Sequence, residues 1–284
     1  MMKAIITDVD GVIVGKKRGV NFPLPNYKVI RKLKKIRAEG IPVVLCTAKS
    51  NFAILEIVKK ANLLNPHIAD GGALIIDPLN DHVIKKRNFD KKLAKDIVSA
   101  CLNGGIYIEC FGVEDCFIQK NQISGFTKKR IEILQKEYRA VPSLMEHATN
   151  FEVIKIIAFA GNEKDKQWIE KVLRPFMKDI HVIWTIHPLI LPVQICIITV
   201  CGASKWQAAF EVLSHLKISP SETLGIGDTL GDWDFMSICK YVATVGNESN
   251  ELKKLVESKG AGCYFYGSSV DNNGILEIFR HFIG

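Results

Sequence analysis

The fold is indicated by the stretch Lys3-Ala4-Ile5-Ile6-Thr7-Asp8-Val9-Asp10-Gly11-Val12, in which an apolar strand leads directly into two carboxylates and a glycine. Side chains two apart on a strand point the same way, so Asp8 and Asp10 are expected to lie together where the chain leaves the sheet. Gly11 allows a sharp turn there. Ligands bind outside the carboxyl ends of strands in open α/β sheets, which favours a reaction site. A solvated turn with a helix-capping Asp would also explain this dipeptide.

The composition is that of a folded protein with a sizeable core. The 284 residues are 48% hydrophobic and 24% charged, which excludes a disordered chain, and the length favours two domains. The longest apolar candidate, 180–200, is interrupted by His and Pro, and the N-terminus lacks the pattern of a signal peptide. We therefore expect a cytoplasmic protein with no membrane partner. The eight cysteines form no CxxC pair, which favours free thiols and argues against zinc.

The formal net charge of +8 favours anionic partners. Residues 28–37 contain six Lys or Arg side chains, which could suggest nucleic-acid binding. However, apolar residues recur within the same segment at helical spacing, so the basic residues are interpreted as the solvent-exposed face of an amphipathic helix. We expect no nucleic-acid partner and a general attraction for small phosphorylated molecules.

The order of elements predicts an α/β core that is interrupted by an inserted domain. Strand and helix patterns alternate before residue 84 and again after residue 200, as in a doubly wound, mostly parallel sheet. Between them, short strands mix with helices, one of which is predicted over 128–138. The predicted organisation is a core of residues 1–83 and 200–284 with an inserted α+β domain of residues 84–199. A hairpin is predicted over 73–86, with its turn at 78–81.

Three further motifs are placed at the ends of predicted core elements, near Asp8. A strand ends at Thr47 in Leu45-Cys46-Thr47-Ala48-Lys49-Ser50, where a hydroxyl and a following helix N-terminus suit a phosphate group, although a helix cap would also explain it. Lys205 opens a predicted helix, where an anionic partner or plain solvation would account for its charge.

The third motif is Leu224-Gly225-Ile226-Gly227-Asp228-Thr229-Leu230-Gly231-Asp232, in which a strand ends in two acids four residues apart. Magnesium prefers oxygen ligands, so Asp228 and Asp8 would suit a magnesium site. A glycine-rich turn with Asp232 as a helix cap is the alternative. Asp234 is interpreted as a surface residue.

Taken together, these motifs resemble the haloacid dehalogenase superfamily, and within it the Cof-like sugar phosphatases with a large inserted cap domain. The order Asp-x-Asp-Gly, strand-end Thr, Ser-Lys and Gly-Asp-x-x-x-Asp carries the resemblance, which covers nearly the whole chain. The segments Ala69-Asp70-Gly71-Gly72-Ala73 and Val242-Ala243-Thr244-Val245-Gly246-Asn247 resemble the glycine turn before the cap and the late strand and loop.

The resemblance implies a role for each matched residue. Asp8 would be the nucleophile that becomes an aspartyl phosphate, and Asp10 would protonate the leaving group and then activate water. Thr47 and Lys205 would complete the catalytic set, by binding phosphoryl oxygens and by offsetting charge. The substrate phosphate would be bound by Gly11, Thr47, Ala48 and Lys49. Magnesium would be held by Asp8, the carbonyl of Asp10, Asp228 and Asp232.

The resemblance therefore implies a magnesium-dependent phosphomonoester hydrolase for a small phosphorylated metabolite, with a sugar phosphate as the expected substrate. The alternatives are a phosphosugar mutase of the phosphomannomutase type and a non-catalytic phosphometabolite-binding protein. Three motifs depart from the family pattern: Gly231 stands in place of a common Asn, Ala48-Lys49 in place of Gly-Arg, and Asp70 in place of Asn. The first affects the surroundings of the metal site, and the other two affect leaving-group recognition.

Overall fold

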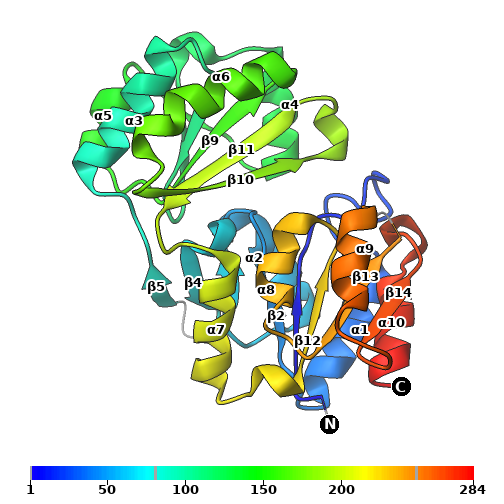
Figure 1. Cartoon of the computed structure of the whole chain (residues 1–284). Helices are drawn as coiled ribbons and strands as arrows, with labels where there is room; N and C mark the ends of the chain where they lie inside the picture. The colour runs from blue at the N-terminus through cyan, green and yellow to red at the C-terminus, as the bar shows by residue number, and fades with distance from the viewer. Residues whose placement is uncertain (1, 80–81, 247–248) are drawn as a thin grey trace. The chain divides into compact units, whose positions relative to one another are not determined.

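The computed structural model describes residues 2–79, 82–246 and 249–284 (Figure 1). By its internal contacts the chain divides into two compact units, which are described separately. The first unit comprises Met1–Lys49, Ile54–Ile84 and Lys205–Gly284, and the second comprises Ser50–Ala53 and Lys85–Ser204.

A five-stranded parallel sheet, in the order β14-β13-β12-β1-β2, forms the centre of the first unit. Its strands are β1 Ala4–Thr7, β2 Val43–Leu45, β12 Thr223–Gly227, β13 Tyr241–Val245 and β14 Tyr264–Gly267. The chain passes from β1 to β2 on one side, and β12 later adds to the other side of β1. The carboxyl ends of β1 and β12 therefore flank the point where the strand order reverses, which is where open α/β sheets bind ligands. The predicted α/β class with a parallel core is confirmed.

The helices of this unit are amphipathic. They are α1 Tyr27–Ala38, α2 Asn51–Ala61, of which residues 54–61 belong to this unit, α7 Lys205–Leu216, α8 Trp233–Met236, α9 Asn250–Glu257 and α10 Ile275–Phe282. In α1 the side chain of Asn26 accepts a hydrogen bond from the Lys28 N–H at 3.0 Å, which caps the first turn. The helix then buries Val29, Leu33 and Ile36, which share one face at a spacing of three to four residues. Residues of α7, α8 and α9 pack with Ala4 and Ile6 of β1 in one hydrophobic cluster.

A small sheet in the order β3-β4-β5 precedes the second unit in sequence. Its strands are β3 His67–Ala69, β4 Leu74–Asp77 and β5 His82–Lys86. The strands β4 and β5 are neighbours, as the hairpin prediction requires, while Asn80 and Asp81 of its turn lie outside the described residues. None of the described helices is long and apolar enough to cross a membrane.

The second unit is built on a six-stranded sheet in the order β10-β11-β9-β6-β7-β8, in which only the β7–β8 pair is parallel. The strands are β6 Ile108–Phe111, β7 Cys116–Gln119, β8 Arg139–Val141, β9 Lys155–Ala160, β10 Ile180–Ile186 and β11 Gln194–Val200. The helices are α3 Lys91–Asn103, α4 Gly125–Leu134, α5 Leu144–Asn150 and α6 Glu163–Leu173. Apolar side chains of α3, α5 and α6 pack with alternate residues of β6, β9 and β11, which is the mixed α+β arrangement that the sequence predicts here.

Several predicted elements were wrong in extent or were missed. The helix predicted over 128–138 ends at Leu134, because Gln135 takes a left-handed conformation with φ of 55° and the chain then enters β8. The strands β8, β11 and β14 and the helices α5, α9 and α10 were not predicted. The eight cysteines are free thiols, as expected, although Cys201 is exposed and Cys263 is half-buried.

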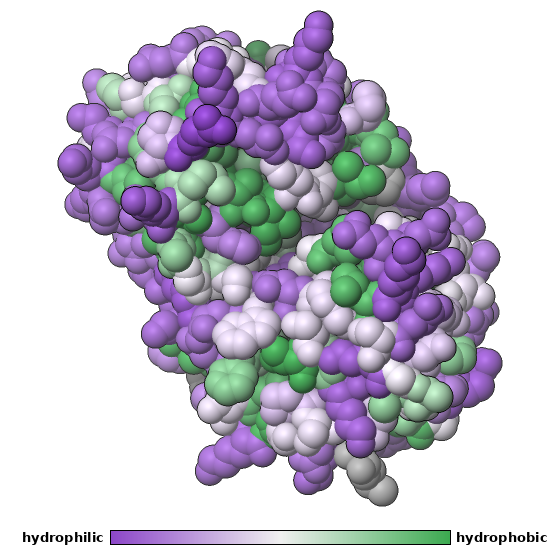
Figure 2. All heavy atoms as spheres, viewed as in Figure 1, coloured by the Kyte–Doolittle hydropathy of each residue, from purple (hydrophilic) through white to green (hydrophobic). Residues whose placement is uncertain are grey.

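Polar residues dominate the surface in view in Figure 2, and apolar areas on it are scattered.

Candidate active site

The carboxylate of Asp8 lies at the end of β1, beside the end of β12. The parallel register pairs Thr7 with Ile226, and the Asp8 N–H donates to the Ile226 carbonyl at 2.9 Å. Only 6% of Asp8 is exposed. Burial raises the pKa of Asp8 to about 7, and the neighbouring Lys205 ammonium counteracts part of that rise. The side chain is therefore a desolvated carboxylate whose charge depends on nearby cations.

Lys205, at the start of α7, joins two of the predicted acids. Its Nζ donates to Asp8 Oδ1 at 2.8 Å and to Asp232 Oδ1 at 2.7 Å, and the side chain is buried. Burial alone would lower the pKa of Lys205, but Asp232 and Asp8 together raise it well above its ordinary value. This lysine is therefore a permanent cation between two carboxylates.

Asp234, interpreted from the sequence as a surface residue, also has a structural role that the sequence did not indicate. Its side chain is half-buried, and Oδ2 accepts a hydrogen bond from the Trp206 N–H at 2.9 Å, in the first turn of α7. The carboxylate satisfies a backbone donor that the helix itself leaves unpaired. Asp234 thus fixes the helix end that carries Lys205, a contact between residues far apart in sequence.

Asp232 has both carboxylate oxygens occupied by donors. Oδ1 binds Lys205, and Oδ2 accepts from the N–H groups of Asp228 at 3.2 Å and Thr229 at 3.0 Å and from the Thr229 hydroxyl at 2.8 Å. Burial raises the pKa of Asp232, but Lys205 and Thr229 outweigh it and hold the pKa below its ordinary value. The alternative prediction, that Asp232 caps the helix that follows it, is wrong: its side chain makes no cap hydrogen bond to α8, and it is instead the third residue of a capping box with Thr229 in the turn Leu230–Asp232.

Asp228 differs from Asp232 because one of its oxygens has no donor. Oδ1 is buried and has no hydrogen-bond partner among the described residues. Burial raises the pKa of Asp228 well above its ordinary value, and the charges of Asp232 and Asp8 raise it further. Gly11 makes this position possible: it has φ of +82°, and a Cβ on it would lie 1.9 Å from Asp228 Oδ2.

These acids have the donor set of a magnesium site. Ligand atoms of Asp8, Asp228 and Asp232 all lie within 4.8 Å of one another. Because Asp232 already accepts four hydrogen bonds, the oxygens left for a cation belong mainly to Asp8 and Asp228. A buried, unpaired carboxylate oxygen beside a second acid is costly unless a cation neutralises it, so the residues fit Mg²⁺.

The loop after β2 brings Thr47 and Lys49 to Asp10. Thr47 is 1% exposed, and its Oγ1 accepts a hydrogen bond from the Lys49 N–H at 3.1 Å. The Lys49 ammonium lies 3.0 Å from Asp10 Oδ1, and only 9% of the Lys49 side chain is exposed. This ion pair was not predicted, because the motifs place the two loops near one another but do not indicate which of their side chains are in contact. Ala48, between them, is half-buried.

The glycine turn Asp70–Gly72 holds this loop through backbone hydrogen bonds. The Asp70 N–H donates to the Lys49 carbonyl at 2.8 Å, and the Gly71 N–H donates to the Thr47 carbonyl at 3.0 Å. Asp70 is fully buried with φ of 53°, a conformation that Asp tolerates better than most residues. Asp70, which stands where the family commonly has Asn, is therefore in contact with the loop that is predicted to bind phosphate. Of the late loop, Asn247 lies outside the described residues.

His67 is a supporting residue that the sequence did not indicate. Its Nδ1 accepts a hydrogen bond from the Leu45 N–H at 3.1 Å, and its Nε2 lies 3.0 Å from the Leu63 carbonyl, so the neutral ring donates there. Burial lowers the pKa of His67 to about 4. The ring therefore holds the end of β2, two residues before Thr47, in one neutral form.

Comparison with known proteins identifies the family of this chain. The profile of haloacid dehalogenase-like hydrolases matches residues 5–278. Phosphatase YwpJ of Bacillus subtilis is 22% identical over 99% of this chain and 100% of its own, and a phosphoglycolate phosphatase of Staphylothermus marinus is 21% identical over 92% and 94%. A solved structure described as a subclass IIB sugar phosphatase of this superfamily aligns with a TM-score of 0.78 at 21% identity, over 99% of this chain and 98% of that one. The chain belongs to the haloacid dehalogenase-like hydrolase family, as its motifs predicted.

Proposed function

We propose that the protein is a magnesium-dependent phosphomonoester hydrolase that acts on a small phosphorylated metabolite through an aspartyl phosphate. The observation that carries the proposal is the buried group of Asp8, Lys205 and Asp232 beside the unpaired Oδ1 of Asp228. Asp8 Oδ2 accepts no hydrogen bond from Lys205, so it is the oxygen that we assign to the attack on phosphorus. The matched family profile supports a hydrolase.

In the first step, Asp8 Oδ2 forms a bond to phosphorus, and the bond from phosphorus to the leaving oxygen breaks. The leaving oxygen takes a proton from Asp10. In the second step, Asp10 accepts a proton from water, the water oxygen bonds to phosphorus, and the ester bond to Asp8 breaks with release of phosphate. Lys205 stays bound to Asp8 and Asp232 and balances their charge. When bound by Asp8, the Asp10 carbonyl and Asp228, Mg²⁺ supplies positive charge to the phosphoryl oxygens.

The ion pair between Asp10 and Lys49 has to open for this sequence to run. Asp10 has to reach the leaving oxygen in the first step, whereas its Oδ1 lies 3.0 Å from the Lys49 ammonium, which competes for the same carboxylate. The phosphoryl group of the substrate carries more negative charge than the Asp10 carboxylate, so we assign Lys49 to the phosphoryl group. Thr47 Oγ1 and the amides of Ala48 and Gly11 complete the proposed phosphate contacts. Asp10 is then released for proton transfer.

We assign catalysis to residues 1–83 and 200–284 and the choice of leaving group to the inserted residues 84–199. The names of the similar proteins, a sugar phosphatase and a phosphoglycolate phosphatase, support a phosphate-ester substrate. We propose a sugar phosphate as the substrate class. Such a metabolite also fits the cytoplasmic location that the sequence favours.

The direct test is phosphate release from a panel of sugar phosphates and 2-phosphoglycolate, with Mg²⁺ and with EDTA. The expected result is Mg²⁺-dependent release that Asp8→Asn abolishes and the exposed control Asp96→Asn leaves unchanged. Isomerised sugar phosphate without free phosphate would assign a mutase instead. Ligand binding with no turnover of any substrate would assign a binding protein and overturn the proposal.

A further inference from the structure

Helix α1 carries most of the excess positive charge of this protein. It contains six Lys or Arg side chains and no Asp or Glu, so it alone supplies +6 of the formal net charge of +8. The amphipathic interpretation accounts for its buried face, Val29, Leu33 and Ile36. It does not say what the basic face contacts.

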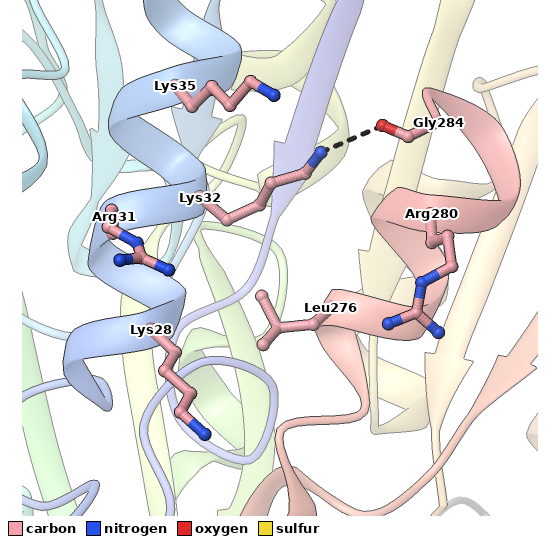
Figure 3. Close-up of a pocket in the computed structure, with 7 residues that line it drawn as sticks. All are labelled: Lys28, Arg31, Lys32, Lys35, Leu276, Arg280 and Gly284. Carbon is pink, nitrogen blue, oxygen red and sulfur yellow. Dashed lines mark hydrogen bonds between the residues drawn. The ribbon is translucent and has the colours of Figure 1, made fainter.

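The basic face of α1 borders a groove whose other side is α10. Figure 3 shows Lys32 and Lys35 of α1 and Leu276 of α10 directed into the space between the two helices, while the guanidinium groups of Arg31 and Arg280 lie apart from one another, each beside its own helix. The groove has a volume of about 570 Å³, which lies within the usual size of small-molecule sites. It is lined by Lys28, Arg31, Lys32, Lys35, Leu276, Arg280 and Gly284. Five of these are cations, and no acidic side chain is among them.

Not all five cations are equally available. Lys32 Nζ donates to the Gly284 carbonyl at 3.1 Å, and Lys35 Nζ lies 3.7 Å from Glu39 Oε1. Glu277, on α10, has its two oxygens bonded to the Ser268 N–H and hydroxyl, both at 2.8 Å. The remaining cations of the groove, which have no ion pair among the described residues, are Lys28, Arg31 and Arg280.

We propose that this groove binds a small molecule with two or more phosphate groups, at a site distinct from the candidate active site. None of the residues of the candidate active site lines it. Residues 28 to 35 span about 10 Å of helix, so their charges suit an extended anion better than a single phosphate. Arg31 belongs to α1 and Arg280 to α10, on opposite sides of the groove. Each guanidinium group can donate two parallel hydrogen bonds to oxygens of one phosphate group. No aromatic side chain lines the groove for base stacking, which argues against single-stranded RNA.

The test is titration calorimetry with inorganic tripolyphosphate, at constant ionic strength and without Mg²⁺. The Asp8→Asn protein is used, so the result does not depend on the proposed hydrolysis. The groove variant is Arg31→Gln/Arg280→Gln. The control is Lys34→Gln/Lys254→Gln, which loses the same charge at two exposed residues outside the groove.

The expected result is binding that weakens about tenfold or more in the groove variant, since two charge-assisted contacts are lost, and by no more than about twofold in the control. Orthophosphate is expected to bind more weakly than tripolyphosphate. Equal weakening in both variants would show attraction to net charge alone and would overturn the proposal, as would no binding. Tighter binding of an RNA oligonucleotide with the same dependence on Arg31 and Arg280 would assign the groove to nucleic acid instead.

Discussion

Replacing Asp228 with Asn is expected to stabilise the metal-free protein while removing its response to Mg²⁺. Asp228 has a buried, unpaired oxygen and lies with Asp8 and Asp232 within 4.8 Å. At a pH high enough to ionise both Asp228 and Asp8, two unit charges at 4.8 Å repel by about 3 kcal/mol at an effective dielectric constant of about 20. Lys205 offsets part of this repulsion, so a net gain of about 1 to 3 kcal/mol is expected from the neutral amide.

The assay is thermal unfolding followed by circular dichroism, in EDTA and in excess Mg²⁺. For a protein of this size, 1 kcal/mol corresponds to a shift of about 2 to 4 °C, so Asp228→Asn is expected to raise the Tm in EDTA by about 2 to 12 °C. The wild-type protein gains stability when Mg²⁺ is added, because the ion binds only the folded state. The variant is expected to lose most of that gain.

Asp232→Asn is the matched control, because it makes the same chemical change 4 residues away. Its oxygens already accept four hydrogen bonds, one of them from Lys205, so loss of the charge is expected to lower the Tm in EDTA. The two variants should therefore shift the Tm in opposite directions. Destabilisation by Asp228→Asn, or an undiminished response to Mg²⁺, would refute the assignment of Asp228 as the unpaired metal ligand.

Three further predictions follow from single contacts. Gly11→Ala is expected to cost more than about 2 kcal/mol and to weaken Mg²⁺ binding, because the added Cβ meets Asp228 and φ is positive; an unchanged Tm and Mg²⁺ affinity would be inconsistent with the close approach. Lys205→Met is expected to lower stability by about 3 to 5 kcal/mol and to abolish turnover, since it leaves Asp8 and Asp232 buried without a cation; chemical denaturation and phosphate release measure the two effects, and retained activity would contradict the role. Burial lowers the pKa of His67 to about 4 in the folded protein, whereas the unfolded chain binds the same proton at about pH 6.5. The free energy of unfolding is therefore expected to fall by about 3 kcal/mol as the pH drops from about 6.5 towards 4. Urea unfolding of wild type and His67→Gln over that range should show a smaller loss in the variant, and identical slopes would exclude His67 as the cause.

The residues of the candidate site could be predicted because each of them follows a strand or opens a helix in sequence. Asp8 and Asp228 directly follow apolar strands, and a parallel sheet brings the carboxyl ends of its strands to one edge. The order of the four motifs then indicated the family. Each motif could be recognised within a short stretch of sequence. The rule that parallel strands end at one edge of a sheet then predicted that the motifs lie close together.

Contacts between separate loops could not be predicted in the same way. The Asp10–Lys49 ion pair, the Asp234 cap on α7 and the support of β2 by His67 join residues whose spacing in sequence carries no pattern. Short strands such as β8 and β14 were missed because three or four residues give too little periodicity to recognise. The helix α10 was missed despite its strongly amphipathic pattern.

The sequence by itself determined the parallel core, the interruption by an inserted segment and the family, because hydrophobic periodicity and ordered motifs are properties of local stretches of chain. Only the tertiary structure decided which charges are compensated. Asp228 and Asp232 look alike in the sequence, yet one is unpaired and the other is saturated with donors. Likewise α1 is a basic helix in the sequence, and it becomes one wall of a groove because α10, about 240 residues further along the chain, packs against it. Electrostatic energy depends on distance and burial, which the fold sets between residues that the sequence separates.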